Sequence, residues 1–264
     1  MNGKRIWLTG ATSGIGLALA EQLAAQGATL VLSARREPEL RALAERLPGE
    51  HLVVPLDLND TLHLGALVAP VLNKLGGLDI LINNAGVSQR SLAQDTDMAV
   101  YRQVMEVNYF AVVALTKAVL PAMLAQGAGT IVAVSSVAGK VGSKLRSGYS
   151  GAKFAVLGFM DCLRAEVSGQ GIQVLSICPG FVATDIARNA LTGDGRRQGR
   201  SDEVIDRGIN PHDCAARIIG AIEAGEDEVV IARGLPRLAV TLKAWLPSLV
   251  RRLAARQSLP QRAD

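Results

Sequence analysis

The sequence has few of the residues that mark several large functional classes. Only 3% of its 264 residues are aromatic, and only three are cysteine. Three scattered cysteines are too few for a disulfide framework, and no Cys/His cluster has the spacing of a metal site. We therefore expect a reducing, cytoplasmic setting and no metal. So few aromatic residues leave little material for stacking on bases, which argues against a nucleic-acid partner.

Long apolar runs are also missing. No uninterrupted stretch of 18 apolar residues exists, and nothing before Ile6 resembles the apolar region of a signal peptide. We therefore expect neither a membrane-spanning nor a secreted protein. With 49% hydrophobic and 20% charged residues, the composition is that of a globular protein with a large core.

The formal net charge of +4 is unevenly distributed along the chain. From Arg233 to the end there are seven Lys or Arg residues and one Asp, so this part carries +6. The remaining residues, 1–232, carry a net charge of −2. They show no basic stripe of the kind that nucleic-acid-binding proteins present. The basic character therefore belongs to the C-terminal tail, 236–264.

This tail mixes Leu, Val and Trp with Arg and Lys in the segment PRLAVTLKAWLPSLVRRLAAR, 236–256. Three interpretations stay open: a hydrophobic lid over the substrate, a peripheral contact with an anionic membrane, or helices packed on the body or on a partner subunit. Pro247 divides any helix here into two short pieces, which weakens binding as an isolated membrane anchor. We therefore favour a lid or a subunit contact.

Short apolar segments alternate with segments of helical period along the body of the chain. The expected strands are 5–9, 29–32, 52–56, 78–82, 130–135, 173–178 and 228–232, and the expected helices are 15–26, 37–47, 61–75, 97–126, 149–168 and 211–224. Such alternation predicts one α/β domain over 1–235, a doubly wound Rossmann fold with a seven-stranded parallel sheet. The polar, glycine-rich segment 188–210 interrupts the pattern and is expected to be a mobile substrate lid loop.

A glycine-rich segment, TGATSGIG at 9–16, stands where the first strand meets the first helix. Glycine permits a sharp turn there and lets a pyrophosphate approach the helix N-terminus closely. A plain glycine-rich turn is the alternative, but the position at the first strand–helix junction favours a dinucleotide site. The residues expected to contact the dinucleotide are Gly10, Thr12, Ser13, Gly14, Ile15 and Gly16.

The end of the second strand indicates which dinucleotide is bound. An acidic residue there would accept the ribose hydroxyls of NAD, but this sequence has Ser33-Ala34-Arg35-Arg36. Two guanidinium groups suit a 2′-phosphate. Cations are unfavourable at a helix start, which argues against a merely solvated helix end. We therefore favour NADP(H) over NAD(H), bound by Ser33, Arg35 and Arg36.

Several polar residues are expected at the carboxyl edge of the sheet, where open α/β sheets bind their ligands. Ser136 follows the fifth strand, and Asn83-Asn84-Ala85-Gly86 ends the fourth. Tyr149 and Lys153 lie four residues apart and share one face of a helix, a weak signal by itself. Asn108 falls inside a long helix, where Asn is unfavourable unless its amide has a role.

In combination these motifs resemble the classical short-chain dehydrogenases/reductases. The resemblance covers residues 4–232 and rests on TGxxxGIG at 9–16, Asp57, NNAG at 83–86, Asn108, Ser136, YxxxK at 149–153 and PGxVxT at 179–184. The stretches 31–40, 53–60, 83–92 and 101–124 further resemble the family's member-seven branch, which is associated with steroids, retinoids and other lipophilic carbonyls. That branch often carries an N-terminal membrane anchor, which we do not expect here because the first strand begins at once.

The resemblance implies a role for each residue. Tyr149 would be the general acid in reduction, and Ser136 would hold the substrate carbonyl. Lys153 would bind the nicotinamide ribose and lower the pKa of the tyrosine, which is near 10 in a free phenol. Asn108 would anchor a proton-relay water, and Asp57 would bond the adenine amino group. Further implied cofactor contacts are Leu58, Asn84, Ala85, Gly86, Pro179, Gly180, Val182 and Thr184.

The expected function is hydride transfer between NADP(H) and the carbonyl or alcohol of a bulky lipophilic substrate. An extended-type epimerase or dehydratase shares YxxxK, but usually has a GxxGxxG loop and a larger C-terminal region. A catalytically silent NADP(H)-sensing regulator would keep the fold, but the intact Ser, Tyr and Lys argue against it. Small and apolar residues along 101–126 and 150–168 predict a homodimer or homotetramer.

Overall fold

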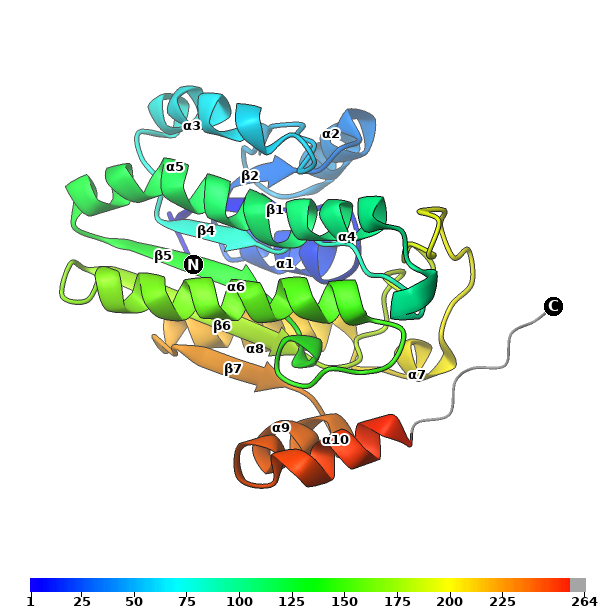
Figure 1. The fold of residues 1–264 in the computed structure, drawn as a ribbon. Helices are drawn as coiled ribbons and strands as arrows, with labels where there is room; N and C mark the ends of the chain where they lie inside the picture. Colours follow the sequence, from blue (N-terminus) through cyan, green and yellow to red (C-terminus); the bar gives the residue numbers. More distant parts are fainter. Residues whose placement is uncertain (257–264) are drawn as a thin grey trace.

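A parallel sheet of seven strands forms the middle layer of the protein (Figure 1). The structure, a computed structural model, describes residues 1–256. The strands are β1 (Arg5–Thr9), β2 (Thr29–Ser33), β3 (Leu52–Val53), β4 (Ile80–Asn83), β5 (Gly129–Val134), β6 (Ile172–Pro179) and β7 (Glu228–Ile231). Their order is β3-β2-β1-β4-β5-β6-β7, and every pairing is parallel. The predicted doubly wound fold is confirmed.

Helices cover both faces of the sheet, because the strands are apolar on both sides. Ile6 and Leu8 of β1 face one core, whereas Trp7 between them faces the other. The first core is closed by α1 (Gly14–Ala25), α2 (Glu37–Arg46) and α8 (Pro211–Glu223), and the second by α3 (Thr61–Leu75), α5 (Ala111–Gln126) and α6 (Ser147–Glu166). Figure 1 shows the two layers on opposite sides of the strands.

The helix expected over 97–126 is interrupted in the middle. It consists of α4 (Met98–Met105), a π-helical turn (Glu106–Phe110) and α5. A π-turn adds a residue to one helical turn and often marks a functional site. By length and composition Met98–Gln126 could cross a bilayer, but Leu115 and Val119 lie in the core, as in a buried helix of a globular protein.

The third strand is shorter than the expected 52–56. It ends at Val53, although the backbone N–H groups of Val54 and Leu56 still donate hydrogen bonds toward the chain of β2. Pro55 has no N–H and a fixed φ, which suits only an edge strand and ends the regular ladder. The loop that follows β3 therefore begins early and carries Asp57 to the carboxyl edge of the sheet.

The segment 188–210 crosses the carboxyl ends of the strands and contains only one short helix, α7 (Glu203–Asp206). Backbone hydrogen bonds tie it to the loop after β4: Leu191 N donates to Ser88 O, and Arg90 N donates to Leu191 O, both at 2.8 Å. The segment thus lies where a lid is expected, and its mobility stays a prediction.

The tail forms two helices, α9 (Leu235–Trp245) and α10 (Pro247–Ala255), separated before Pro247 as expected. A positive φ of 60° at Gly234 lets the chain turn sharply after β7, and the helices lie beside that edge of the sheet (Figure 1). Lys243 Nζ lies 4.5 Å from the centroid of the Phe154 ring on α6. No described tail residue lines the main pocket, so these helices are not the predicted lid. The membrane contact stays a prediction, and residues 257–264 of the tail lie outside the described part.

Candidate active site

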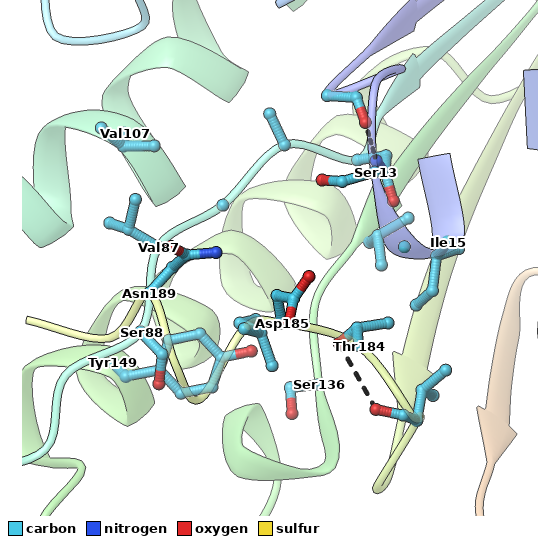
Figure 2. Close-up of a pocket in the computed structure, with 18 of the residues that line it drawn as sticks. Ser13, Ile15, Val87, Ser88, Val107, Ser136, Tyr149, Thr184, Asp185 and Asn189 are labelled. Atoms are coloured by element: carbon cyan, nitrogen blue, oxygen red, sulfur yellow. Dashed lines mark hydrogen bonds between the residues drawn. The ribbon is translucent and has the colours of Figure 1, made fainter. Parts of the chain in front are cut away.

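A cavity of about 300 Å³ opens at the carboxyl ends of the strands. Figure 2 shows Ser13 and Ile15 at one end and Tyr149 and Ser136 toward the other, with Thr184 between them. The predicted residues that line it are Gly10, Thr12, Ser13, Gly14, Ile15, Ser33, Arg35, Arg36, Asp57, Leu58, Asn84, Ala85, Gly86, Ser136, Tyr149, Lys153, Pro179, Gly180, Val182 and Thr184. Of the predicted site residues, Gly16 and Asn108 do not line it.

The glycines of the loop after β1 are required by close packing. A Cβ on Gly10, whose φ is 70°, would lie 2.9 Å from the Cα of Ala85. A Cβ on Gly14, whose φ is 54°, would lie 2.9 Å from the Thr184 methyl group. Gly16 does not line the cavity but packs against the loop itself: its Cβ would lie 2.0 Å from the carbonyl oxygen of Gly10, and its cofactor contact stays a prediction. Gly16 therefore packs α1 against the loop.

The N-terminus of α1 is open toward the cavity. Ser13 is its N-cap residue, but its side chain makes no capping hydrogen bond, and the first turn contains no acidic residue. The free N–H groups and the positive end of the helix dipole therefore meet no negative partner among the described residues. This arrangement fits the pyrophosphate of a dinucleotide.

The residues after β2 differ in their freedom to bind a phosphate. Arg36 forms an ion pair with Glu39, and this hydrogen bond raises the pKa of Arg36. Arg35 is exposed and has no side-chain partner among the described residues. The Ser33 hydroxyl accepts a hydrogen bond from Trp7 Nε1 at 2.9 Å, so this side chain is turned toward the core. Arg35 is therefore the group best placed to meet a phosphate.

Helix α6 and the end of β5 bring Tyr149, Lys153 and Ser136 together. Ser136 caps the short helix Val137–Gly139, accepting from Ala138 N at 3.0 Å. Lys153 Nζ lies 5.8 Å from the centroid of the Tyr149 ring. Nζ donates to a carbonyl oxygen of β5, that of Val134, at 2.8 Å, and burial lowers the pKa of Lys153 to about 8.

The environment of Tyr149 differs from the expectation. Burial raises the pKa of its phenol, and a hydrogen bond with Ser136 and the charges of Arg146 and Arg90 act in the opposite direction. Lys153 Nζ lies near the ring but donates its hydrogen bond to the Val134 carbonyl oxygen. Two arginines that the motifs did not identify thus favour the phenolate form of the tyrosine, and the predicted effect of Lys153 on its pKa stays a prediction.

Asn108 stands behind the cavity wall, in the π-turn. Its Oδ1 accepts from Val87 N at 3.0 Å, and its Nδ2 donates to Val87 O at 2.8 Å and to Val104 O at 3.0 Å. A Cβ on Gly86 would lie 2.7 Å from Asn108 Oδ1 and 3.4 Å from Lys153 Nζ. The side chain therefore positions the Gly86–Val87 backbone beside Lys153. Its relay water stays a prediction.

The site residues predicted from the sequence do not make up the whole wall of the cavity. The structure puts Val87, Ser88, Arg90, Val107, Arg146, Phe181, Asp185, Ile186, Asn189, Arg197 and Ile205 on the wall. One of them had a usable signal: Arg146 precedes Tyr149 by three residues, a spacing that puts both on one helix face. Val107 lies in the π-turn and Ile205 in the short helix α7, and the others come from loops, where no periodicity exists to indicate direction.

The sequence matches the family model described as short chain dehydrogenase over residues 4–194. The chain belongs to the short-chain dehydrogenase family. It is 42% identical over 257 residues to a dehydrogenase/reductase SDR family protein 7-like of Anopheles gambiae, covering 94% of this chain and 81% of that protein. It is 41% identical to dehydrogenase/reductase SDR family member 7B of Bos taurus, over 97% and 81% of the two chains. The resemblance to the member-seven branch is confirmed.

Solved structures of this family are similar to the fold. A short-chain dehydrogenase from Streptomyces avermitilis is 30% identical with a TM-score of 0.82, covering 96% of this chain and 95% of the other. A short-chain dehydrogenase/reductase from Burkholderia phymatum, in complex with NAD, is 25% identical with a TM-score of 0.82, over 98% of each chain. A putative NAD(P)-dependent gluconate 5-dehydrogenase from Beutenbergia cavernae, with bound NADP, is 27% identical with a TM-score of 0.75, over 88% and 95%. This protein is thus an oxidoreductase that uses a nicotinamide dinucleotide.

Proposed function

We propose that this protein reduces the carbonyl of a bulky lipophilic substrate with NADPH, or oxidises the corresponding alcohol with NADP⁺. The observation that carries the proposal is a single cavity with two different ends. At one end the α1 N-terminus is open to a pyrophosphate, and at the other Tyr149, Ser136 and Lys153 meet. A ligand that uses both ends has a phosphate group at one end and a group that reacts at the other, as a nicotinamide dinucleotide has.

The nicotinamide, when bound, supplies or accepts the hydride, and the protein handles the proton. In reduction, the Ser136 hydroxyl holds the carbonyl oxygen and Tyr149 donates its phenolic proton to that oxygen. The hydride and this proton together convert the carbonyl to an alcohol. Because burial raises the pKa of Tyr149, the phenol is protonated at neutral pH and ready to act as an acid.

The preference for NADP(H) is supported by Arg35. Its guanidinium is exposed at the cavity edge and has no side-chain partner among the described residues, so it can bind a 2′-phosphate without breaking an ion pair. Arg36 would first have to leave Glu39. No carboxylate of the loop after β2 lines the cavity there to accept the ribose hydroxyls of NAD.

A lipophilic substrate is supported by the wall near Tyr149. Val87, which lies beside Tyr149 in Figure 2, contributes an apolar side chain to the cavity, as do Val107, Phe181, Ile186 and Ile205. Burial of apolar substrate surface against them would stabilise the complex by about 25 cal/mol per Å². Small hydrophilic carbonyl compounds would gain little from such a wall.

The test is turnover of purified protein with NADPH or NADH and a panel of aldehydes, quinones and ketosteroids, followed by the loss of reduced cofactor. We expect faster turnover with NADPH and with the bulkier apolar carbonyls. Tight NADPH binding without turnover of any carbonyl would contradict the proposal and indicate the nucleotide-sensing regulator. Equal rates with both cofactors would contradict the NADP(H) preference alone.

A further inference from the structure

Two arginines that the proposed chemistry does not use lie at the reactive end of the cavity. Arg90 comes from the loop after β4, and only 9% of its side chain is exposed. Arg146 is the N-cap residue of α6, three residues before Tyr149, and 19% of its side chain is exposed. Their charges both act on the Tyr149 phenol, so they lie close to the reacting group.

The two guanidinium groups have too little negative charge around them. Asp202 is the one acidic partner of either among the described residues, with its Oδ2 3.8 Å from Arg90 and 3.7 Å from Arg146. Both distances are those of an ion pair but exceed a hydrogen bond, so the carboxylate is hydrogen-bonded to neither group. Arg90 otherwise donates to Ser88 Oγ at 3.2 Å and to Gln89 O at 3.4 Å. Arg90, Arg146 and Asp202 together therefore carry a net charge of about +1, which is costly in a buried place unless an anion joins them.

The charge of Arg146 disfavours the charged form of Arg90. Burial and the charge of Arg146 lower the pKa of Arg90 to about 10, against an ordinary value of 12.5. Burial also lowers the pKa of Arg146, whose guanidinium otherwise lies 5.7 Å from the centroid of the Phe181 ring. An anion between the two groups would reverse both effects.

The backbone holds the pair in place before any ligand arrives. Arg90 N donates to Leu191 O at 2.8 Å, and the next residue, Ser91, donates to Leu145 O at 3.1 Å. Leu145 has a φ of 65°, and no other non-glycine residue in the described chain has a positive φ. Such a conformation costs about 1–3 kcal/mol and persists where the surroundings impose it, often at binding sites. The strained residue directly precedes Arg146.

We propose that Arg90 and Arg146 bind a carboxylate of the substrate while the carbonyl of that substrate lies at Tyr149. The inference deepens the proposed function and rests on it. A carboxylate carries the one negative charge that the pair lacks, and its two oxygens match the paired donors of a guanidinium. Asp185, which also lines the cavity, forms its ion pair with Arg188 at 3.6 Å and with neither of the two arginines. The substrate is thus a lipophilic oxo-carboxylic acid, or in the reverse direction the hydroxy acid.

The kinetic test uses ω-oxo carboxylic acids of increasing chain length, each paired with its methyl ester, and NADPH. The readout is the ratio of kcat/KM for the acid to that for its ester, because changes at Tyr149 affect both substrates alike. We expect at least one chain length to favour the acid by about 10-fold or more, as charge-assisted hydrogen bonds do. Arg146→Gln should bring this ratio close to one.

A second variant should change the acid-to-ester ratio of kcat/KM in the opposite direction. Asp202→Asn removes the competing carboxylate and, since Asn is also a good N-cap residue, keeps the start of α7. It should raise the ratio of acid to ester. Arg217→Gln is the control. It removes an arginine of α8 that forms an ion pair with Glu226, and it should leave the ratio unchanged. A ratio near one in the wild type, or one insensitive to Arg146→Gln and Asp202→Asn, would overturn the proposal.

A binding measurement separates this proposal from the proposed function. With NADP⁺ saturating, so that the phosphate-binding loop is filled, hexanoate and hexanamide are titrated calorimetrically into the wild type and into Arg146→Gln. We expect hexanoate to bind more tightly than hexanamide in the wild type only. That result supports the carboxylate site even if no carbonyl is turned over. Equal binding of the two compounds, or tighter binding of hexyl phosphate than of hexanoate, would overturn the carboxylate assignment.

Discussion

Asn108 and Val87 are joined by a reciprocal pair of hydrogen bonds, 3.0 Å from Val87 N to Oδ1 and 2.8 Å from Nδ2 to Val87 O. A side chain from the π-turn thereby satisfies both backbone groups of a residue in the loop after β4. The amide lies between the helix and the loop and is fully buried. The π-turn thus brings the polar side chain of Asn108 to the cavity wall beside Lys153.

Asn108→Leu should therefore destabilise the protein. The change leaves the N–H and C=O of Val87 without these partners, at about 1–3 kcal/mol for each buried group. We expect the free energy of unfolding in urea to fall by at least about 2 kcal/mol. Asn73→Leu, at an exposed position of α3, is the matched control and should change it little. Equal stabilities of the two variants would contradict the positioning role.

Tyr149→Phe should remove most turnover while leaving NADPH binding nearly unchanged. The variant loses the phenolic proton but keeps the ring that fills the site, and general acid catalysis is worth about 10²–10⁴-fold in rate. The measurements are kcat for the best carbonyl substrate and the Kd of NADPH from fluorescence. Tyr109→Phe, a ring packed against Phe110 and Phe159, serves as the control. More than a tenth of wild-type activity in Tyr149→Phe would refute the assignment.

Arg35→Asp should shift the cofactor preference toward NADH. It removes the free guanidinium and adds repulsion against a 2′-phosphate, so the ratio of NADPH to NADH efficiency should fall about 10²-fold or more. Arg41→Gln removes a charge that is paired with Glu37 on the same helix and should leave this ratio as it is. If Arg35→Asp leaves the ratio unchanged, the phosphate is recognised elsewhere.

Lys153→Met should stabilise the fold of the cofactor-free protein while removing activity. In the folded state the pKa of Lys153 is about 8, against an ordinary 10.5, so below pH 8 the fold carries a buried ammonium. The gain should be about 2 kcal/mol at pH 7 after the loss of the hydrogen bond to Val134, and should shrink as pH rises from 8 toward 10.5. Urea unfolding across this range measures it, with the exposed Lys117→Met as control. A gain that grows with pH would contradict the argument.

The predicted homodimer or homotetramer can be tested at Phe110. This ring is 48% exposed at the junction of the π-turn and α5, on a helix expected to face a partner subunit. Phe110→Glu would place a charge in an apolar interface and should lower the sedimentation coefficient to that of a monomer. Leu62→Glu, at a 92% exposed position of α3, should leave the assembly intact. A wild type that sediments as a monomer at micromolar concentration would contradict the prediction.

The sequence by itself determined the layer architecture and most of the predicted residues that line the cavity. Strands such as Thr29–Ser33 are short with an apolar middle, and helices such as Thr61–Leu75 have a regular period with clear ends, so local pattern is sufficient. The glycines at 10 and 14 were likewise readable, because the conformations they adopt leave no room for a side chain. At these two positions the glycine motif of the sequence and the backbone conformation of the structure require the same residue.

Only the tertiary structure decided which groups act on one another. Arg90 and Arg146 are 56 positions apart in a chain whose loops carry no periodic signal, yet both reach the Tyr149 phenol and share Asp202. The direction of the Lys153 ammonium toward Val134 and the path of the tail after Gly234 were also beyond local pattern. Side-chain direction in loops depends on packing between distant segments. Sequence spacing therefore identified the reactive groups, and long-range packing set their electrostatic environment.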